Sequence, residues 1–134
     1  MAGKRIDHIG IAVADLDEAQ AQYVQLFGAV AIGRDSLPDT DAVLLELGDT
    51  RIELVAARGP ETPVGKFIAN RGPGMHHVAF EVADVAAELG RLAGAGVELV
   101  DEVPRPGLFG HTVAFVHPRS VGGVLAELVE HERE

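Results

Sequence analysis

Residues 74–82 read Gly-Met-His-His-Val-Ala-Phe-Glu-Val, and they repeat the start of the chain, where residues 6–13 read Ile-Asp-His-Ile-Gly-Ile-Ala-Val. Aligning the two stretches places His77 on His8. A strand-like motif that occurs once in each half of a chain indicates a duplicated module. Two histidines at equivalent points of two modules suggest one shared site.

The first half of the chain is expected to follow the order strand, helix, strand, strand, strand. Residues 6–14 are mostly β-branched or small, which favours a strand buried on much of both faces. Asp15 is an N-cap residue with Glu18 three positions later, and Gly28 is a typical C-cap, so a helix is expected between them. Three apolar runs, separated by a polar loop at 34–41 and a turn at 48–49, predict the remaining strands at residues 29–32, 42–47 and 51–56.

The second half repeats this order after a connector that carries one short helix at about residues 64–70. Asp84 is the expected N-cap of its long helix, which Gly-Ala-Gly at 94–96 ends. The expected strands of this half are residues 76–82, 97–100, 111–117 and 124–130. We therefore predict a single domain over residues 1–134, with module 1 at about 5–57, the connector at about 58–73 and module 2 at about 74–131.

Composition and charge narrow the classes of function. The chain has no cysteine, so disulfides and thiolate ligands are excluded, and any metal must be held by His, Asp or Glu. A formal net charge of -10 opposes attraction to nucleic acid, whose phosphates require clustered Lys and Arg. The N-terminus shows no apolar leader, and no run of about 18 apolar residues occurs, so we expect a soluble, cytoplasmic protein that does not contact membranes.

Each half offers one histidine near the start of its first strand and one glutamate in its last strand. These are His8 and Glu53 in the first half, and His77 and Glu127 in the second. Equivalent positions converge if the modules pair around a pseudo-two-fold axis. A carboxylate buried in so apolar a strand is costly unless it is paired or binds a cation. Two imidazoles and two carboxylates suit a divalent ion such as Co, Mn, Ni, Fe or Zn.

A structural interpretation of these residues competes with the metal interpretation. Most histidines are neither ligands nor catalysts, and a glutamate in an apolar strand most often lies on its solvent face. Recurrence at equivalent points of both halves favours the metal. Four other histidines lack this symmetry: His76, His111, His117 and His131. Of these, His76 is expected to be a hydrogen-bonding or surface residue. By strand alternation His76 also points away from the face that carries His77.

The motifs resemble those of the vicinal oxygen chelate superfamily, which includes the glyoxalases and bleomycin resistance proteins. Residues 7–13 and 74–82 carry this resemblance. Within the superfamily, residues 47–54 and the tail at 113–128, with its His-Pro-basic turn before Gly-Gly-Val-Leu, resemble the methylmalonyl-CoA epimerases. The resemblance covers nearly the whole chain. It implies an α+β fold in which two paired β-α-β-β-β modules form an open, cupped mixed sheet with the helices outside.

The resemblance also implies a function. It makes His8, Glu53, His77 and Glu127 the ligands of one divalent metal ion per chain, with Glu at 53 where some relatives carry Gln. The implied reaction is epimerisation at C2 of methylmalonyl-CoA through a metal-chelated enolate, in which Glu127 shares the acid/base work. The implied partners are an acyl-CoA substrate and a second copy of the chain in a homodimer.

One position departs from the family pattern. Some relatives carry a further glutamate at the position of about Ala42, where this chain has no carboxylate. Asp41 and Glu46 are the nearest acids, and by alternation only Glu46 shares a face with Ala42. Other relatives lack this glutamate too, so the second proton carrier stays open between Asp41, Glu46 and a metal-bound water.

Two other functions remain as alternatives. A glyoxalase I-like isomerase of a glutathione hemithioacetal would use the same ligand set. A metal-free small-molecule binding protein of the same superfamily would not need the four ligands, whose presence argues against it. The loop at 107–111 is a candidate wall of the acyl path, and Arg119, Lys66 and Arg71 are either solvated surface charges or contacts for CoA phosphates.

Overall fold

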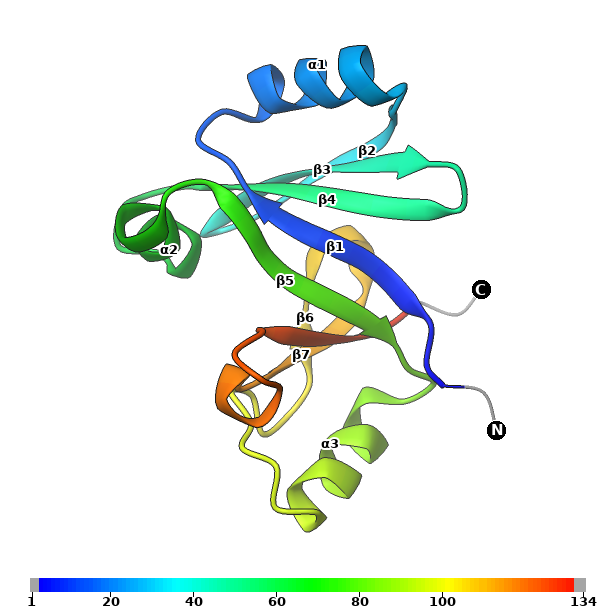
Figure 1. The fold of residues 1–134 in the computed structure, drawn as a ribbon. Coiled ribbons are helices and arrows are strands. Elements are labelled where there is room, and N and C mark those ends of the chain that lie inside the picture. The colour runs from blue at the N-terminus through cyan, green and yellow to red at the C-terminus, as the bar shows by residue number, and fades with distance from the viewer. Residues whose placement is uncertain (1–2, 132–134) are drawn as a thin grey trace. The chain divides into compact units, whose positions relative to one another are not determined.

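The computed structural model describes residues 3–131 and shows the α+β class expected from the sequence (Figure 1). Its elements alternate as the repeat predicts, and three α-helices separate groups of strands. In chain order they are β1 (Ile6–Ala12), α1 (Leu16–Phe27), β2 (Val30–Leu37), β3 (Thr40–Leu47), β4 (Thr50–Ala57), α2 (Pro63–Arg71), β5 (Gly74–Glu81), α3 (Val85–Gly94), β6 (Arg105–Pro106), η1 (Leu108–Gly110), β7 (Thr112–Val116), η2 (Pro118–Ser120) and β8 (Ala126–Glu130). Within the described part of the chain, no helix is both long and apolar enough to cross a membrane.

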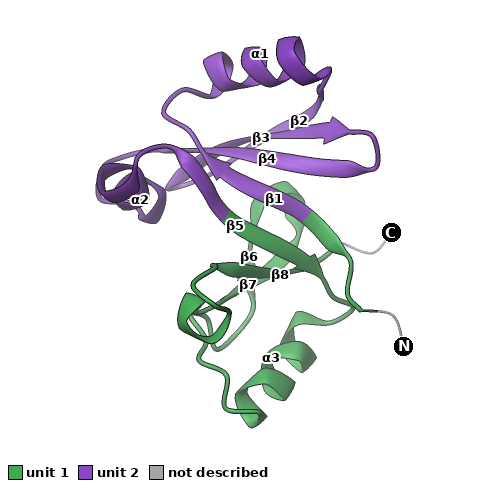
Figure 2. Ribbon diagram, viewed as in Figure 1, with its two compact units in different colours: residues 1–7, 77–134 green, residues 8–76 purple. Residues whose placement is uncertain are grey.

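The chain divides into two compact units, which Figure 2 colours separately. Unit 2 comprises residues 8–76, and unit 1 comprises residues 1–7 together with residues 77–134. The boundaries fall inside strands. One lies between Asp7 and His8 in β1, and the other between His76 and His77 in β5.

In unit 2 the strands are ordered β2-β3-β4-β1, and α1 packs on one face of this sheet. The carboxylate of Asp15 accepts the backbone N–H of Glu18 at 3.0 Å, and α1 ends at Gly28 with φ 70°, so both expected caps are confirmed. Strand β4 lies between parallel β1 and antiparallel β3, and Glu53 of β4 has Gly10 and Leu44 as its two register partners.

Unit 1 repeats this arrangement with the order β5-β8-β7-β6. Asp84 accepts the N–H of Ala87 at 3.0 Å, which confirms it as the N-cap of α3. Glu127 of β8 has Ala79 of β5 and Phe115 of β7 as its register partners. The β1 and β5 partners of the two glutamates each lie two residues after a histidine, so the sequence repeat extends to the strand register.

The prediction of a strand at residues 97–100 is wrong. Only Leu99 forms a bridge, to Val116, and a two-residue strand, β6, follows later. The N–H groups of Val100 and Asp101 both donate to the carbonyl of Phe115, at 3.0 and 3.2 Å. Two consecutive donors on one acceptor bulge the chain, and this bulge ends the ladder before it becomes a strand.

The prediction of a polar loop at residues 34–41 is also partly wrong. Strand β2 continues through Leu37, and only a short turn separates it from β3. Because β2 is the edge strand of unit 2, much of it faces water, and its polar residues hide the apolar alternation that marks a strand.

A charged contact ties the N-terminal segment to α3 within unit 1. Glu88 Oε1 lies 3.0 Å from Arg91 Nε and 3.2 Å from Lys4 Nζ. The hydrogen bond from Arg91 lowers the pKa of Glu88 below its usual value, against the effect of partial burial, and Lys4 lowers this pKa further. The ionised form of Glu88 therefore contributes stability to the folded state.

We expect Glu88→Gln to lower the free energy of unfolding near pH 7 and to lower it by a smaller amount near pH 3. A depressed folded-state pKa contributes stability above the unfolded pKa, and this contribution is lost as the pH falls through the folded pKa. Urea denaturation of both proteins at the two pH values measures the effect. An equal loss at both would show that the carboxylate charge is not the cause.

We expect Asp84→Ala to lower the free energy of unfolding by about 1 kcal/mol, because the first turn of α3 loses its cap. Asp84→Asn is the matched control, since asparagine caps about as well as aspartate, and it should stay close to wild type. Urea denaturation curves of the three proteins provide the measurement. Equal losses in both variants would contradict a capping role.

Candidate metal centre

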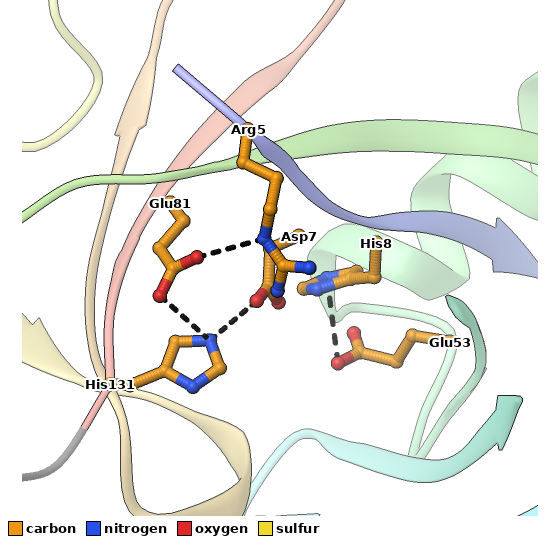
Figure 3. A network of polar contacts seen from close by, with 6 residues as sticks. All are labelled: Arg5, Asp7, His8, Glu53, Glu81 and His131. Atoms are coloured by element: carbon orange, nitrogen blue, oxygen red, sulfur yellow. Dashed lines mark hydrogen bonds and ion pairs between the residues drawn. The ribbon is translucent and has the colours of Figure 1, made fainter. Parts of the chain in front are cut away.

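The first expected pair, His8 and Glu53, is brought together in unit 2 (Figure 3). The Nε2 atom of His8 lies 3.5 Å from Oε2 of Glu53. The two side chains come from neighbouring parallel strands, β1 and β4, and both residues are 5% exposed. The structural interpretation of the strand pattern placed Glu53 on a solvent face. The burial of Glu53 contradicts that interpretation.

The second expected pair, His77 and Glu127, has the same geometry in unit 1. Nε2 of His77 lies 3.2 Å from Oε1 of Glu127, and the residues are 5% and 8% exposed. They lie on β5 and β8, the strands that correspond to β1 and β4 of unit 2. Each half of the chain thus buries one imidazole against one carboxylate.

The donor chemistry of each pair fits a divalent cation. A carboxylate removed from water is unfavourable by several kcal/mol unless hydrogen bonds or a positive charge compensate it. In both pairs an imidazole Nε2 and a carboxylate oxygen lie within 3.5 Å of each other, which is close enough for both atoms to contact one ion. Mixed nitrogen and oxygen ligands suit moderately hard divalent metals.

The other histidines have structural contacts. The ring of His76 meets that of Phe67 edge-on, with 5.0 Å between centroids. The Nδ1 atom of His117 accepts the N–H of Arg119 at 3.0 Å and begins the short helix η2. His111 and His131 stack with 4.3 Å between ring centroids. Each of these four histidines thus contacts a neighbouring side chain or backbone group.

A polar cluster that the sequence reasoning missed surrounds His131 in unit 1. Its Nε2 lies 2.5 Å from Oδ1 of Asp7 and 4.0 Å from Oε2 of Glu81, and Nε of Arg5 lies 3.0 Å from the other oxygen of Glu81 (Figure 3). Asp7 is only 7% exposed. Its position inside an apolar strand was the one available signal, because the cluster joins distant segments and has no counterpart in the repeat.

The two acids nearest to Ala42 lie in different environments. Asp41 accepts a hydrogen bond from Oγ of Ser36 at 2.6 Å, and its carboxylate is 3.8 Å from Nη1 of Arg58. Glu46 is exposed, and Arg51 is its register partner on β4. Asp41 is thus already engaged by polar neighbours, whereas Glu46 faces water.

Each unit also contains an open cavity. In unit 2, a cavity of about 650 Å³ lies beside the start of α1 and is lined by Asp15, Asp17, Asp35 and Asp41 together with Arg34. Because Arg34 is already bonded to Asp17, this cavity is acidic and suits a phosphate poorly. In unit 1, a cavity of about 330 Å³ is lined by parts of residues 104–112, including Arg105 and His111. The loop at 107–111 therefore borders a space large enough for part of a small molecule.

Comparison with known proteins agrees with this description. Residues 7–115 match the family described as the Glyoxalase/Bleomycin resistance protein/Dioxygenase superfamily. The chain is 36% identical over 128 residues to the ethylmalonyl-CoA/methylmalonyl-CoA epimerase of Cereibacter sphaeroides, and the match covers 92% of this chain and 96% of that protein.

Solved structures show the same relationship. The crystal structure of methylmalonyl-CoA epimerase from Mycobacterium tuberculosis superposes with a TM-score of 0.92 at 35% identity, covering 99% of this chain and 93% of that chain. A methylmalonyl-CoA epimerase in complex with methylmalonyl-CoA and NH4+ superposes with a TM-score of 0.91 at 33% identity, covering 96% and 95%. The resemblance inferred from the strand motifs is confirmed. The chain therefore belongs to the Glyoxalase/Bleomycin resistance protein/Dioxygenase superfamily and, within it, to the family of the methylmalonyl-CoA epimerases, which are isomerases.

Proposed function

We propose that the two histidine–glutamate pairs together hold one divalent metal ion per chain, with His8, Glu53, His77 and Glu127 as ligands. Three observations support this. The pairs occupy equivalent positions of the sequence repeat, they have equivalent strand registers, and all four side chains are buried. The donor set suits Co, Mn, Ni, Fe or Zn.

The proposed reaction is epimerisation at C2 of methylmalonyl-CoA. The observation that carries it is the pair of buried histidine–glutamate contacts in a chain of the methylmalonyl-CoA epimerase family. A relative of known structure binds methylmalonyl-CoA, which supports an acyl-CoA substrate. The name of the Cereibacter sphaeroides relative includes ethylmalonyl-CoA, so that substrate is a second candidate. Homodimer assembly and a cytoplasmic location stay predictions.

Epimerisation requires that a proton leave one face of C2 and that a proton return to the other face. A divalent ion, when bound, supplies Lewis-acid stabilisation of the negative charge that develops on the thioester oxygen as the proton leaves. Glu127 is proposed to share the proton transfer, because its carboxylate lies beside His77 at the proposed metal site and can accept a proton. The second proton carrier is proposed to be Asp41, Glu46 or a water molecule.

Glu46 and Asp41 differ in the cost of that role. Protonating Asp41 would weaken its contacts with Ser36 and Arg58. Glu46 is exposed, and it shares a face of β3 with Leu44, the register partner of Glu53. A water molecule could carry the proton without weakening any side-chain contact, and it is the simplest of the three carriers.

We expect the protein, purified without chelators, to contain about one divalent ion per chain by elemental analysis. His77→Ala should remove most of it, because one of four ligands is lost and a buried carboxylate is left without its imidazole. His117→Ala is the matched control, since this histidine is engaged in a helix cap, and it should keep the metal. A folded wild-type protein that takes up none of the five metals would contradict the proposed site.

We expect the wild-type protein to exchange the C2 proton of methylmalonyl-CoA with deuterium from solvent, as followed by NMR. Glu127→Gln should slow this exchange by about 10²- to 10⁴-fold at saturating metal, because amide cannot accept the proton. Glu102→Gln, at an exposed position, is the control.

The same samples should be assayed with ethylmalonyl-CoA and with methylglyoxal plus glutathione. Turnover of the glutathione hemithioacetal without exchange at C2 of either acyl-CoA would favour a glyoxalase I-like isomerase. A protein that binds methylmalonyl-CoA but exchanges no proton, with or without added metal, would favour a binding protein.

A further inference from the structure

Phe115 forms a wall beside the second histidine–glutamate pair. It is the register partner of Glu127 across β7 and β8, so the two side chains share a face of the sheet. Its ring meets the ring of His77 edge-on, with centroids 5.8 Å apart and an interplanar angle of 88°. This edge-to-face arrangement is a favourable aromatic geometry, and it restrains the plane of the imidazole.

Phe115 is itself held by two charged residues of unit 1. The guanidinium carbon of Arg105 lies 5.2 Å from the centroid of the phenyl ring. Nε of Arg105 lies 3.2 Å from Oδ2 of Asp101, and the same oxygen accepts the backbone N–H of Phe115 at 2.8 Å. Asp101 therefore fixes both the backbone of Phe115 and the cation that covers its ring.

The bulge after Leu99 makes this contact possible. In a continuing strand, the N–H of Phe115 would donate to a backbone carbonyl of that strand. Because the bulge ends the ladder, the carboxylate of Asp101 accepts this N–H instead. Asp101 also offsets the charge of Arg105, so a cation near His77 is not opposed by an unpaired guanidinium.

Unit 2 has no such arrangement at the equivalent register position. There Leu44 of β3 is the partner of Glu53, as Phe115 is the partner of Glu127. The first pair thus has an aliphatic neighbour where the second has an aromatic ring with a cation on it. The asymmetry suggests that Phe115 does more than fill space.

We propose that Phe115, held by Arg105 and Asp101, is a positioning residue that orients the imidazole of His77 for metal binding. The inference rests on the proposed metal site. A ligand whose orientation is fixed before the metal arrives loses less conformational freedom on binding, and residues that support metal ligands commonly change affinity by about 10- to 100-fold. Loss of the ring should therefore weaken metal binding without removing any ligand.

The test compares metal affinity among four variants of the full chain. Co²⁺ alone is titrated into metal-free protein, and binding is followed by calorimetry and by the visible absorption of the ion. Phe115→Leu, which gives the second pair the aliphatic neighbour of the first, should raise the dissociation constant about tenfold and change the absorption spectrum. Phe115→Tyr keeps the aromatic ring and should retain the wild-type dissociation constant and absorption spectrum. Arg105→Gln should give a smaller loss.

Phe80→Leu is the matched control, because it makes the same substitution in unit 1 at a residue that packs against the α3 core. It should leave the dissociation constant within about twofold of wild type, as expected for a change that does not touch a ligand. Thermal unfolding of each variant establishes that it is folded.

A second readout needs no metal. In the metal-free protein, proton NMR of the His77 ring reports the ring current of Phe115, and Arg105→Gln should reduce this shift because the phenyl ring is no longer held. A folded Phe115→Leu protein with wild-type affinity and spectrum would overturn the inference, as would an unchanged His77 signal in Arg105→Gln. Wild-type protein that binds no Co²⁺ would instead contradict the proposed metal site, and the NMR comparison would still decide whether Phe115 orients His77.

Discussion

Burial of a glutamate carboxylate in an apolar strand is the constraint on which this structure depends. Glu53 lies between Ile52 and Leu54, and Leu54 is fully buried on the opposite face against α1. A slip of one residue in β4 would place the carboxylate in that core and the leucine beside His8. Glu127 and its neighbour Leu128 impose the same condition on β8. The same strand register that buries the leucine in the apolar core therefore also places each glutamate beside its histidine.

The two pairs satisfy this requirement with different surroundings. Both bury an imidazole against a carboxylate on neighbouring parallel strands. Unit 1 adds an aromatic ring, a guanidinium and the polar cluster around His131, whereas the register partner in unit 2 is a leucine. The two halves therefore present equivalent ligand pairs in unequal surroundings.

Local signals in the sequence predicted much of the fold and of the candidate site. The caps at Asp15 and Asp84 were predictable because each depends on residues three positions apart. The superfamily was predictable from the repeated strand motif, and the inward position of the four candidate ligands was predictable from their recurrence at equivalent points of both halves. The convergence of the two pairs on one ion stays a prediction.

Features that join distant segments could not be predicted. The contact of Asp7 with His131 spans nearly the whole chain, and the contact of Phe115 with His77 depends on a register that no local pattern sets. The missing strand at 97–100 had the right composition, but two consecutive N–H groups bond to one carbonyl there. The full length of edge strand β2 was missed for the opposite reason. Its exposed residues are polar, so they do not show the apolar alternation by which strands are recognised.

The boundary between the compact units falls inside β1 and β5 and not in the connector where the sequence repeat divides. Residues 1–7 belong with the second half of the chain, and residues 74–76 belong with the first. A fragment that began at residue 74 would keep His77 and Glu127 but would leave His131 without Asp7. The repeat can thus still be recognised in the sequence, yet no single cut in the chain separates the two compact units.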